Sequence, residues 1–191
     1  MTSEAEVLRN IIQRRRSVMP PVYNDKKIDR TTLEVIIDSA NYAPTHKLTQ
    51  PWHFIVFTGE SLKELGREIA RLYKLHTSPE KFSERKMIDM EQKPARSAAV
   101  IAIVMESHPH LLPEWEEIAS TATAVENMWL MATALGIGSY WSTPGIINHL
   151  QPFLSLSDNQ KCIGLFYMGY TDVELPASKR EDISTKVQWR E

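Results

Sequence analysis

The sequence predicts an α+β fold in which helices pack on a mixed sheet. Several segments place apolar residues at the spacing of a helix face, and others are short and continuously apolar, as buried strands are. These two kinds of segment do not alternate as the regular βαβ units of a parallel sheet. The 191 residues suit a single domain, and the 7 glycines and 11 prolines are spread along the chain. We therefore expect one domain over residues 1–191.

Two helices are predicted before the first strand. The first begins at Ser3, which together with Glu6 has the spacing of a capping box. Its apolar face follows at Val7, Leu8, Ile11 and Ile12. The second begins near Asp29 and ends before Pro44, because the residue preceding a proline disfavours the helical conformation. Residues 18–27, between the two helices, are predicted to be a loop.

The middle of the chain predicts two buried strands separated by helical and polar segments. The strands cover residues 53–57 and 98–105, which are largely apolar. A helix follows the first strand, with a second capping box predicted at Ser61 and Glu64. Residues 79–93 are polar and charged and favour a short helix. Its apolar side would be formed by Met87, Ile88 and Met90.

The longest helical pattern of the chain covers Pro113–Leu135. Proline suits a first helical turn, and Gly136 suits the end of the helix. Apolar, tryptophan and small residues surround much of this helix, so we expect burial on more than one side and a dimer. A short strand is predicted at 138–141, a long one at 162–170, and a terminal strand at 187–189.

Composition and charge narrow the classes of partner. The formal net charge of −2 gives no general attraction to nucleic acid or to an anionic membrane. No apolar run approaches the roughly 20 residues that a membrane-spanning helix needs. Cys162 is the only cysteine and cannot form an internal disulfide, and residues 1–10 are not typical of a secretory signal. We therefore expect a cytoplasmic protein without nucleic-acid or membrane partners.

The common motifs of nucleotide binding and nucleophilic catalysis are absent from the sequence. There is no glycine-rich dinucleotide fingerprint, no phosphate-binding loop and no nucleophile elbow. The close histidines His108 and His110 have no cysteines or paired acids nearby, so we interpret them as a surface turn and predict no metal ligand. Cys162 has apolar neighbours and is interpreted as a buried packing thiol.

Three segments, far apart in the chain, carry residues suited to a polar ligand. Residues 14–17 are Arg-Arg-Arg-Ser at the end of the first helix, where they suit either the helix dipole or a phosphate. Residues 42–54 form a donor-rich loop that leads into a strand, which suits either a structured turn or a planar ligand. Residues 136–145 combine glycines, aromatic residues and hydroxyls, as a helix end or a close backbone approach would require.

Taken together, these segments resemble the nitroreductase family, in particular its compact single-domain members. The match covers most of the chain in order. Arg15, Arg16 and Ser17 resemble the start of the family's FMN site. Residues 43–54 match the pattern Ala-Pro-x-His-Lys-x-x-Gln-Pro-Trp-His-Phe, which is the most specific part of the resemblance. The long helix that ends in Leu-Gly-Ile-Gly, followed by Trp141, resembles the family's dimer helix and flavin-contacting strand.

The resemblance implies a nitroreductase-like α-β sandwich with a mixed, mostly antiparallel sheet, in an entwined homodimer whose FMN sites lie at the subunit interface. One subunit would contribute Arg15, Arg16, Ser17, Trp141, Ser142 and Thr143. The other subunit would contribute Tyr42 and His46, and Gln50 belongs to the same loop. A late basic pair, Lys179 and Arg180, would reach the phosphate. Compact members often carry arginine where Tyr42 and Ser142 stand here.

The function that this resemblance implies is an FMN-dependent oxidoreductase. Electrons would pass from NADPH or NADH to a nitroaromatic, quinone or similar small-molecule acceptor by a ping-pong mechanism. Chemistry at flavin N5 would explain why the sequence predicts no catalytic acid, base or nucleophile. The alternatives are another flavin reaction on the same scaffold, such as dehalogenation, dehydrogenation or flavin fragmentation, a non-catalytic flavin-binding protein, and a metal-binding or generic α+β protein.

Overall fold

The computed structural model describes residues 2–191. Its helices are α1 (Glu4–Arg14), α2 (Arg30–Asp38), α3 (Glu60–His76), α4 (Glu84–Ala95) and α5 (Glu114–Ala134). Its strands are β1 (Trp52–Phe57), β2 (Ala99–Glu106), β3 (Gly138–Ser142) and β4 (Gln160–Gly169). Short 3-10 helices cover Pro20–Val22, Ser39–Tyr42, His46–Leu48, Ile147–His149 and Ile183–Lys186.

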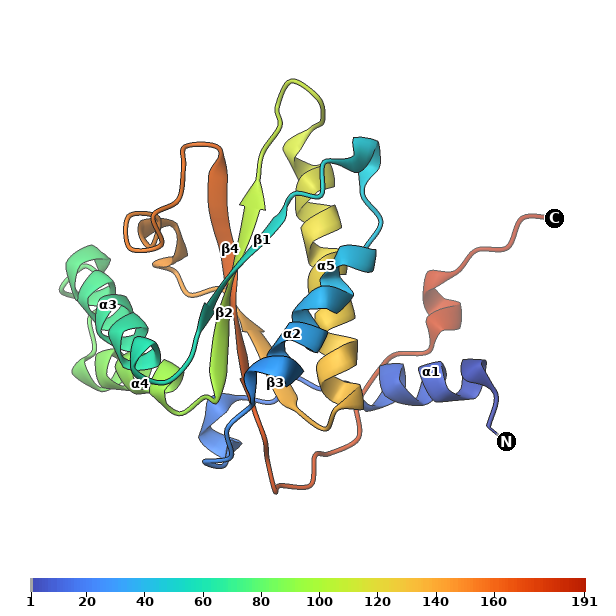
Figure 1. Ribbon diagram of the computed structural model, residues 1–191, viewed down its shortest axis with the longest axis horizontal. Coiled ribbons are helices and arrows are strands. Elements are labelled where there is room, and N and C mark those ends of the chain that lie inside the picture. The colour runs from blue at the N-terminus through green and yellow to red at the C-terminus, as the bar shows by residue number, and fades with distance from the viewer. Residues whose placement is uncertain (1) are drawn as a thin grey trace.

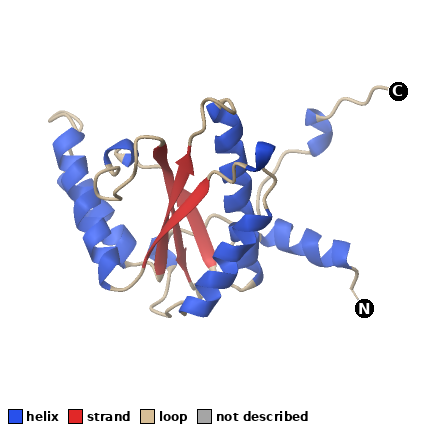
Figure 2. Ribbon diagram, turned by 45° about the horizontal axis from the view of Figure 1, so that its top comes forward, coloured by secondary structure: helices blue, strands red, loops and turns tan. Residues whose placement is uncertain are grey.

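The strands form one sheet in the order β1-β2-β4-β3, and all neighbouring strands are antiparallel. In residues 2–191, parallel pairing is limited to an isolated bridge between Ser17 and Ser139. Figure 2 shows the sheet between two helical layers, and Figure 1 identifies these layers as α3 with α4 on one side and α2 with α5 on the other. The predicted α+β sandwich with a mostly antiparallel sheet is therefore confirmed.

β2 lies at the centre of the molecule because both of its faces are apolar. Ile101 and Ile103 belong to the core that packs under α2 and α5. Val100 and Ala102 belong to the core that packs under α3 and α4. Successive side chains of a strand point to opposite faces, so a continuous apolar run is what a strand buried on both sides requires. The strand predicted at 98–105 is confirmed within one residue at each end.

The two predicted capping boxes have different outcomes. At α1 the box is present, since the Ser3 hydroxyl accepts from the Glu6 amide and the Glu6 carboxylate accepts from the Ser3 amide. At α3 the box is wrong, because the helix starts at Glu60 after Gly59. The Ser61 hydroxyl instead accepts from the Thr58 amide at 3.0 Å and donates to the Thr58 carbonyl at 2.8 Å. Ser61 thus closes the turn that enters the helix.

The polar segment between α3 and β2 forms a full helix, α4. Met87 and Met90 pack against the core beneath it, as predicted. Ile88 is exposed, so its predicted place on the apolar side is wrong. The close packing of α4 on α3 depends on Gly66, because a Cβ atom there would overlap the Glu91 carbonyl oxygen. This packing holds α4 near the edge of the sheet that β3 forms.

The end of the chain does not form the predicted strand at 187–189. Residues 171–191 form an arm that leads away from the sheet and contains the 3-10 helix Ile183–Lys186 (Figure 1). A strand needs a neighbouring strand for its backbone hydrogen bonds, and the part of the chain that the structure describes offers none beside the arm. Trp189, at 85% exposure, has its side chain in solvent. The helices within residues 2–191 include none with the length and apolar character needed to cross a membrane.

Candidate functional site

Residues 15–17 lie beside the free edge of β3. Ser17 pairs with Ser139 in the parallel bridge, and the Val18 amide donates to the Ser139 carbonyl at 2.9 Å. The segment that follows α1 is thereby fixed along the strand that carries Trp141 and Ser142. Two of the three segments singled out in the sequence are therefore neighbours in space, although more than 120 residues separate them.

Arg15 packs against the C-terminal half of α5. Its guanidinium lies 4.6 Å from the ring centroid of Trp129, and its Nε is 3.7 Å from a Glu126 carboxylate oxygen. The Arg15 side chain is only 17% exposed. Burial raises the pKa of Glu126, and the positive charge of Arg15 opposes this rise. The Trp129 indole in turn donates to the Arg16 carbonyl at 3.2 Å, so α5 contacts the side chain of Arg15 and the backbone of Arg16.

The guanidinium of Arg16 joins α1 to the C-terminal arm. It donates to the Gln13 carbonyl at 2.6 Å and to the Pro176 carbonyl at 3.1 Å. Arg16 also lines a cavity of about 380 Å³ whose wall includes Gly136 and Gly138. The predicted basic pair, Lys179 and Arg180, begins three residues after Pro176 on the arm, and both residues are exposed. The arm therefore passes close to Arg16, while the basic pair itself is left facing solvent.

Trp141 packs flat against the sheet. A Cβ atom at Gly164 of β4 would overlap the indole of Trp141, so the absence of a side chain at 164 lets this ring pack directly on the strand. The indole Nε1 and the Ser139 hydroxyl are both buried, and neither has a hydrogen-bond partner among residues 2–191. Thr143 follows β3 and is exposed. The face of β3 that carries Trp141 is thus aromatic and has unused hydrogen-bonding capacity.

Lys93 is a cation beside β3 that the sequence did not reveal. Its ammonium donates to the Ser142 hydroxyl at 3.1 Å. It also lies 4.6 and 4.7 Å from the ring centroids of Tyr140 and Tyr167. Burial lowers the pKa of Lys93, and this ammonium forms no ion pair with a carboxylate in residues 2–191. A cation stabilised by two aromatic rings instead of an acid keeps its charge available to a ligand.

The position of Lys93 bears on one departure from the family pattern. Ser142 stands where compact members often carry arginine, and the structure places the Lys93 ammonium against its hydroxyl. A positive charge is therefore present beside position 142, although it comes from α4. In the sequence, the only sign of a compensating charge near position 142 was that Ser142 stands where an arginine is common.

His46, in the same loop as Gln50, lies at the other end of α5, whereas Tyr42 lies near Asn127 in the second half of the helix. His46 Nδ1 is 2.6 Å from a Glu116 carboxylate oxygen. Thirteen residues separate Glu116 from Trp129 on the same helix, which corresponds to about 20 Å at 1.5 Å per residue. The structure therefore does not bring His46 to Arg15, which packs on Trp129, within one chain.

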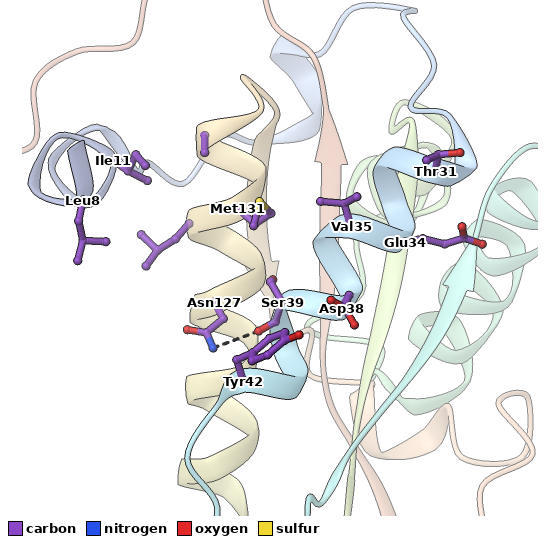
Figure 3. A pocket seen from close by; sticks show the side chains of 12 residues that line it. Leu8, Ile11, Thr31, Glu34, Val35, Asp38, Ser39, Tyr42, Asn127 and Met131 are labelled. Atoms are coloured by element: carbon purple, nitrogen blue, oxygen red, sulfur yellow. Dashed lines mark hydrogen bonds between the residues drawn. The ribbon is translucent and has the colours of Figure 1, made fainter. Parts of the chain in front are cut away.

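Tyr42 lies at a broad open groove on the surface of α5. The groove has a volume of about 830 Å³, and its walls come from α1, α2 and α5. Figure 3 shows Leu8 of α1 on one side of α5 and Val35 of α2 on the other, with Met131 between them. The Tyr42 side chain is 79% exposed at the end of this groove. A large apolar face of the longest helix is thus left open in the single chain.

The remaining candidates have structural explanations. His108 Nδ1 is 2.7 Å from the buried carboxylate of Glu117. In residues 2–191 no three histidine, cysteine, aspartate or glutamate side chains are grouped so as to hold a metal ion. Cys162 is buried, as predicted, and burial raises the pKa of its thiol to about 11. That thiol stays protonated near neutral pH and is a poor nucleophile.

Comparisons with known proteins agree with this geometry. Residues 12–170 match the model of the Nitroreductase family. The Bacillus subtilis (strain 168) protein YfhC, provisionally named an NAD(P)H nitroreductase, is 25% identical over 179 residues, covering 93% of this chain and 91% of YfhC. The nitroreductase-like family protein from Bacillus cereus has a TM-score of 0.83 and 25% identity, covering 100% of this chain and 99% of that one. The FMN-dependent nitroreductase NfnB from Mycobacterium smegmatis, solved in complex with NADPH, has a TM-score of 0.77 and 17% identity, covering 99% and 100%.

Proposed function

This chain belongs to the nitroreductase family, and we propose that it is an FMN-dependent oxidoreductase that takes electrons from NADH or NADPH. The acceptor would be a nitroaromatic, a quinone or a similar small molecule, reduced in a ping-pong cycle. Residues 1–191 would act as one FMN-binding domain, and the single cysteine suits a reducing cytosol. The names of structural relatives, one FMN-dependent and in complex with NADPH, support this choice of cofactor and donor.

The observation that carries the proposal is the group of cations and aromatic rings at the edge of β3. FMN combines an anionic phosphate with a flat ring that has polar edges, and the donors present fit both parts. Arg15, Arg16 and Ser17 would hold the phosphate and the pyrimidine edge, because they share one short segment along β3. Trp141 offers a flat aromatic surface beside them. Lys93 adds a further positive charge on the α4 side of the strand.

When bound, FMN supplies the hydride chemistry, and the protein orients the reactants and sets the electrostatics. The chain contributes positive charge at two places, around Arg16 and at Lys93. Such charge stabilises an anionic ligand and a ring that gains negative charge on reduction. Thr143 is exposed just beyond β3 and would contact the ligand from the strand end. Lys179 and Arg180 would approach the phosphate by a movement of the arm that Arg16 anchors.

We further propose a homodimer in which each site takes residues from both chains. The open groove on α5 and the arm of residues 171–191 both leave apolar surface uncovered in one chain. Large exposed apolar patches are typical of protein interfaces. The separation of about 20 Å along α5 between the Glu116 and Trp129 turns also favours two chains, because one chain cannot bring His46 to Arg15.

An anaerobic visible spectrum of the purified protein tests the proposed activity directly. A flavin spectrum that bleaches on addition of NADPH or NADH is expected, and the more effective donor would be identified at the same time. Parallel initial-rate lines at varied donor and acceptor concentrations are expected for a ping-pong cycle. A protein that stays colourless after incubation with FMN would contradict the proposal. A yellow protein that neither donor bleaches would support flavin binding but contradict the proposed reductase activity.

Replacing Lys93 with methionine is expected to weaken FMN binding about tenfold, because one desolvated charge near the ligand is lost. The FMN-free protein should be at least as stable as the wild type, because methionine avoids the burial of an unpaired ammonium. The Lys93 pKa is lower in the folded state, so the unfolded chain binds more protons between the two pKa values. Wild-type stability should therefore rise with pH in the alkaline range up to about pH 10.4.

The measurements for Lys93 are an FMN fluorescence titration and urea unfolding of the FMN-free protein at neutral and alkaline pH. Lys86→Met is the matched control, because Lys86 is an exposed lysine of the same helix. Unchanged FMN affinity in Lys93→Met would show that this lysine does not contribute to FMN binding.

A further inference from the structure

The loop of residues 43–51 has an unusual backbone. Lys47, Leu48 and Gln50 have φ angles of +49°, +57° and +44°. Side chains with a Cβ atom rarely adopt this left-handed conformation, and three such residues among four consecutive positions are unfavourable without external contacts. The surrounding structure must therefore hold the 43–51 loop in this shape.

The contacts that hold the 43–51 loop come from the start of α5 and the segment before it. His46 Nδ1 is 2.6 Å from a Glu116 carboxylate oxygen, and the Lys47 ammonium donates to the Leu111 carbonyl at 3.2 Å. Within the loop, the Gln50 amide donates to the Thr45 hydroxyl at 3.1 Å. The short contact between His46 and Glu116 fixes the side chain of a predicted site residue from outside the loop.

The start of α5 is itself rigidly anchored. Glu117 has a fully buried side chain whose carboxylate accepts from the His108 amide at 2.8 Å and pairs with His108 Nδ1 at 2.7 Å. Successive helical residues point about 100° apart, so adjacent glutamates can serve different neighbours. Glu117 fixes the segment before α5 to the helix, and Glu116 reaches from this fixed helix to the 43–51 loop.

We propose that Glu116 is a positioning residue that orients His46 for the ligand of the two-chain site. Its carboxylate takes the Nδ1 side of the imidazole, which leaves Nε2 to face a ligand as a hydrogen-bonding group. The group that Nε2 would bond is a polar edge, either of the flavin ring or of the acceptor that the flavin reduces. This inference rests on the proposed function, because it takes His46 as part of the FMN site.

The test compares Glu116→Ala, Glu116→Gln and the control Glu114→Gln in the full-length protein. Glu114 lies on the same turn of α5 but pairs with Lys161, away from the 43–51 loop. The readouts are hydrogen exchange of residues 45–51 in the FMN-free protein and the dissociation constant of added FMN. Glu116→Ala should speed exchange of these residues and raise the dissociation constant about tenfold. Glu116→Gln keeps an oxygen that accepts from Nδ1, so it should stay near the wild type, as should Glu114→Gln.

Unchanged exchange of residues 45–51 in Glu116→Ala would overturn the proposal, because the loop would then not depend on this carboxylate. Faster exchange with unchanged FMN affinity would also overturn it, because Glu116 would then only stabilise the loop. A wild-type protein that binds no FMN would contradict the proposed function instead. Even then the exchange experiment decides whether Glu116 holds the 43–51 loop.

Discussion

Replacing Arg16 with alanine is expected to raise the FMN dissociation constant about a hundredfold, or roughly 3 kcal/mol in binding free energy. A hydrogen bond from a guanidinium to a phosphate is strong because both partners are charged. The same guanidinium also donates to the Pro176 carbonyl of the arm. Its loss would therefore remove one cation and release the segment that carries Lys179 and Arg180. FMN fluorescence titration measures the effect.

Two further variants separate the roles of Arg16. Arg16→Lys keeps the charge but loses the planar arrangement of donors, so an intermediate affinity is expected. Arg9→Ala is the control, because Arg9 is an exposed arginine of α1, the helix that precedes Arg16. Equal affinity of Arg16→Ala and the wild type would mean that the phosphate is held elsewhere. In that case the cavity that Arg16 and Gly138 line would not be the phosphate site.

Local sequence signals predicted the elements whose stabilising contacts are also local. The capping box of α1 joins residues three apart, and β2 is recognisable because seven of its eight residues are apolar. At α3 the same reasoning failed, because the Ser61 hydroxyl bonds to the amide and the carbonyl of Thr58 and does not cap the helix. A serine near a helix start therefore identifies the helix more reliably than its first residue.

Contacts distant in sequence explain what the sequence did not reveal. Lys93 lies in a polar segment, and its partners Tyr140, Ser142 and Tyr167 are 47 to 74 positions away. The strand predicted at 187–189 failed for a related reason. Its composition suits a strand, but a strand also needs a neighbour for its backbone, which composition does not encode.

The two departures from the family pattern have different structural settings. At Ser142 the Lys93 ammonium supplies a charge beside the missing arginine. At Tyr42 the side chain projects into the groove on α5 and is mostly exposed. An aromatic ring in that place contributes apolar contact area where an arginine would contribute charge. In a two-chain site, the charge on the ligand would therefore be balanced mainly by the subunit that provides Arg15, Arg16 and Lys93.

Mixing two defective variants is expected to restore FMN binding if each site takes residues from both chains. Arg16→Ala damages one half of the site, and His46→Ala damages the half that would come from the other subunit. In a mixed dimer, one of the two sites receives an intact Arg16 from one chain and an intact His46 from the other. With random pairing of equal amounts, roughly a quarter of all sites should be intact, because closed two-fold dimers hold two equivalent sites.

The experiment refolds or co-expresses the two variants and counts bound FMN at a concentration that saturates the wild type but neither variant. A mixture of Arg16→Ala with Ser17→Ala is the control, because both changes damage the same half of the site and leave every mixed site defective. Recovery in the first mixture alone would support the two-chain site, since the groups at the two ends of α5 are about 20 Å apart along the helix. Equal binding in both mixtures, or a particle of 21.9 kDa by light scattering, would contradict it. The open face of α5 would then have to serve another partner, because a monomer offers nothing to cover Leu8 and Met131.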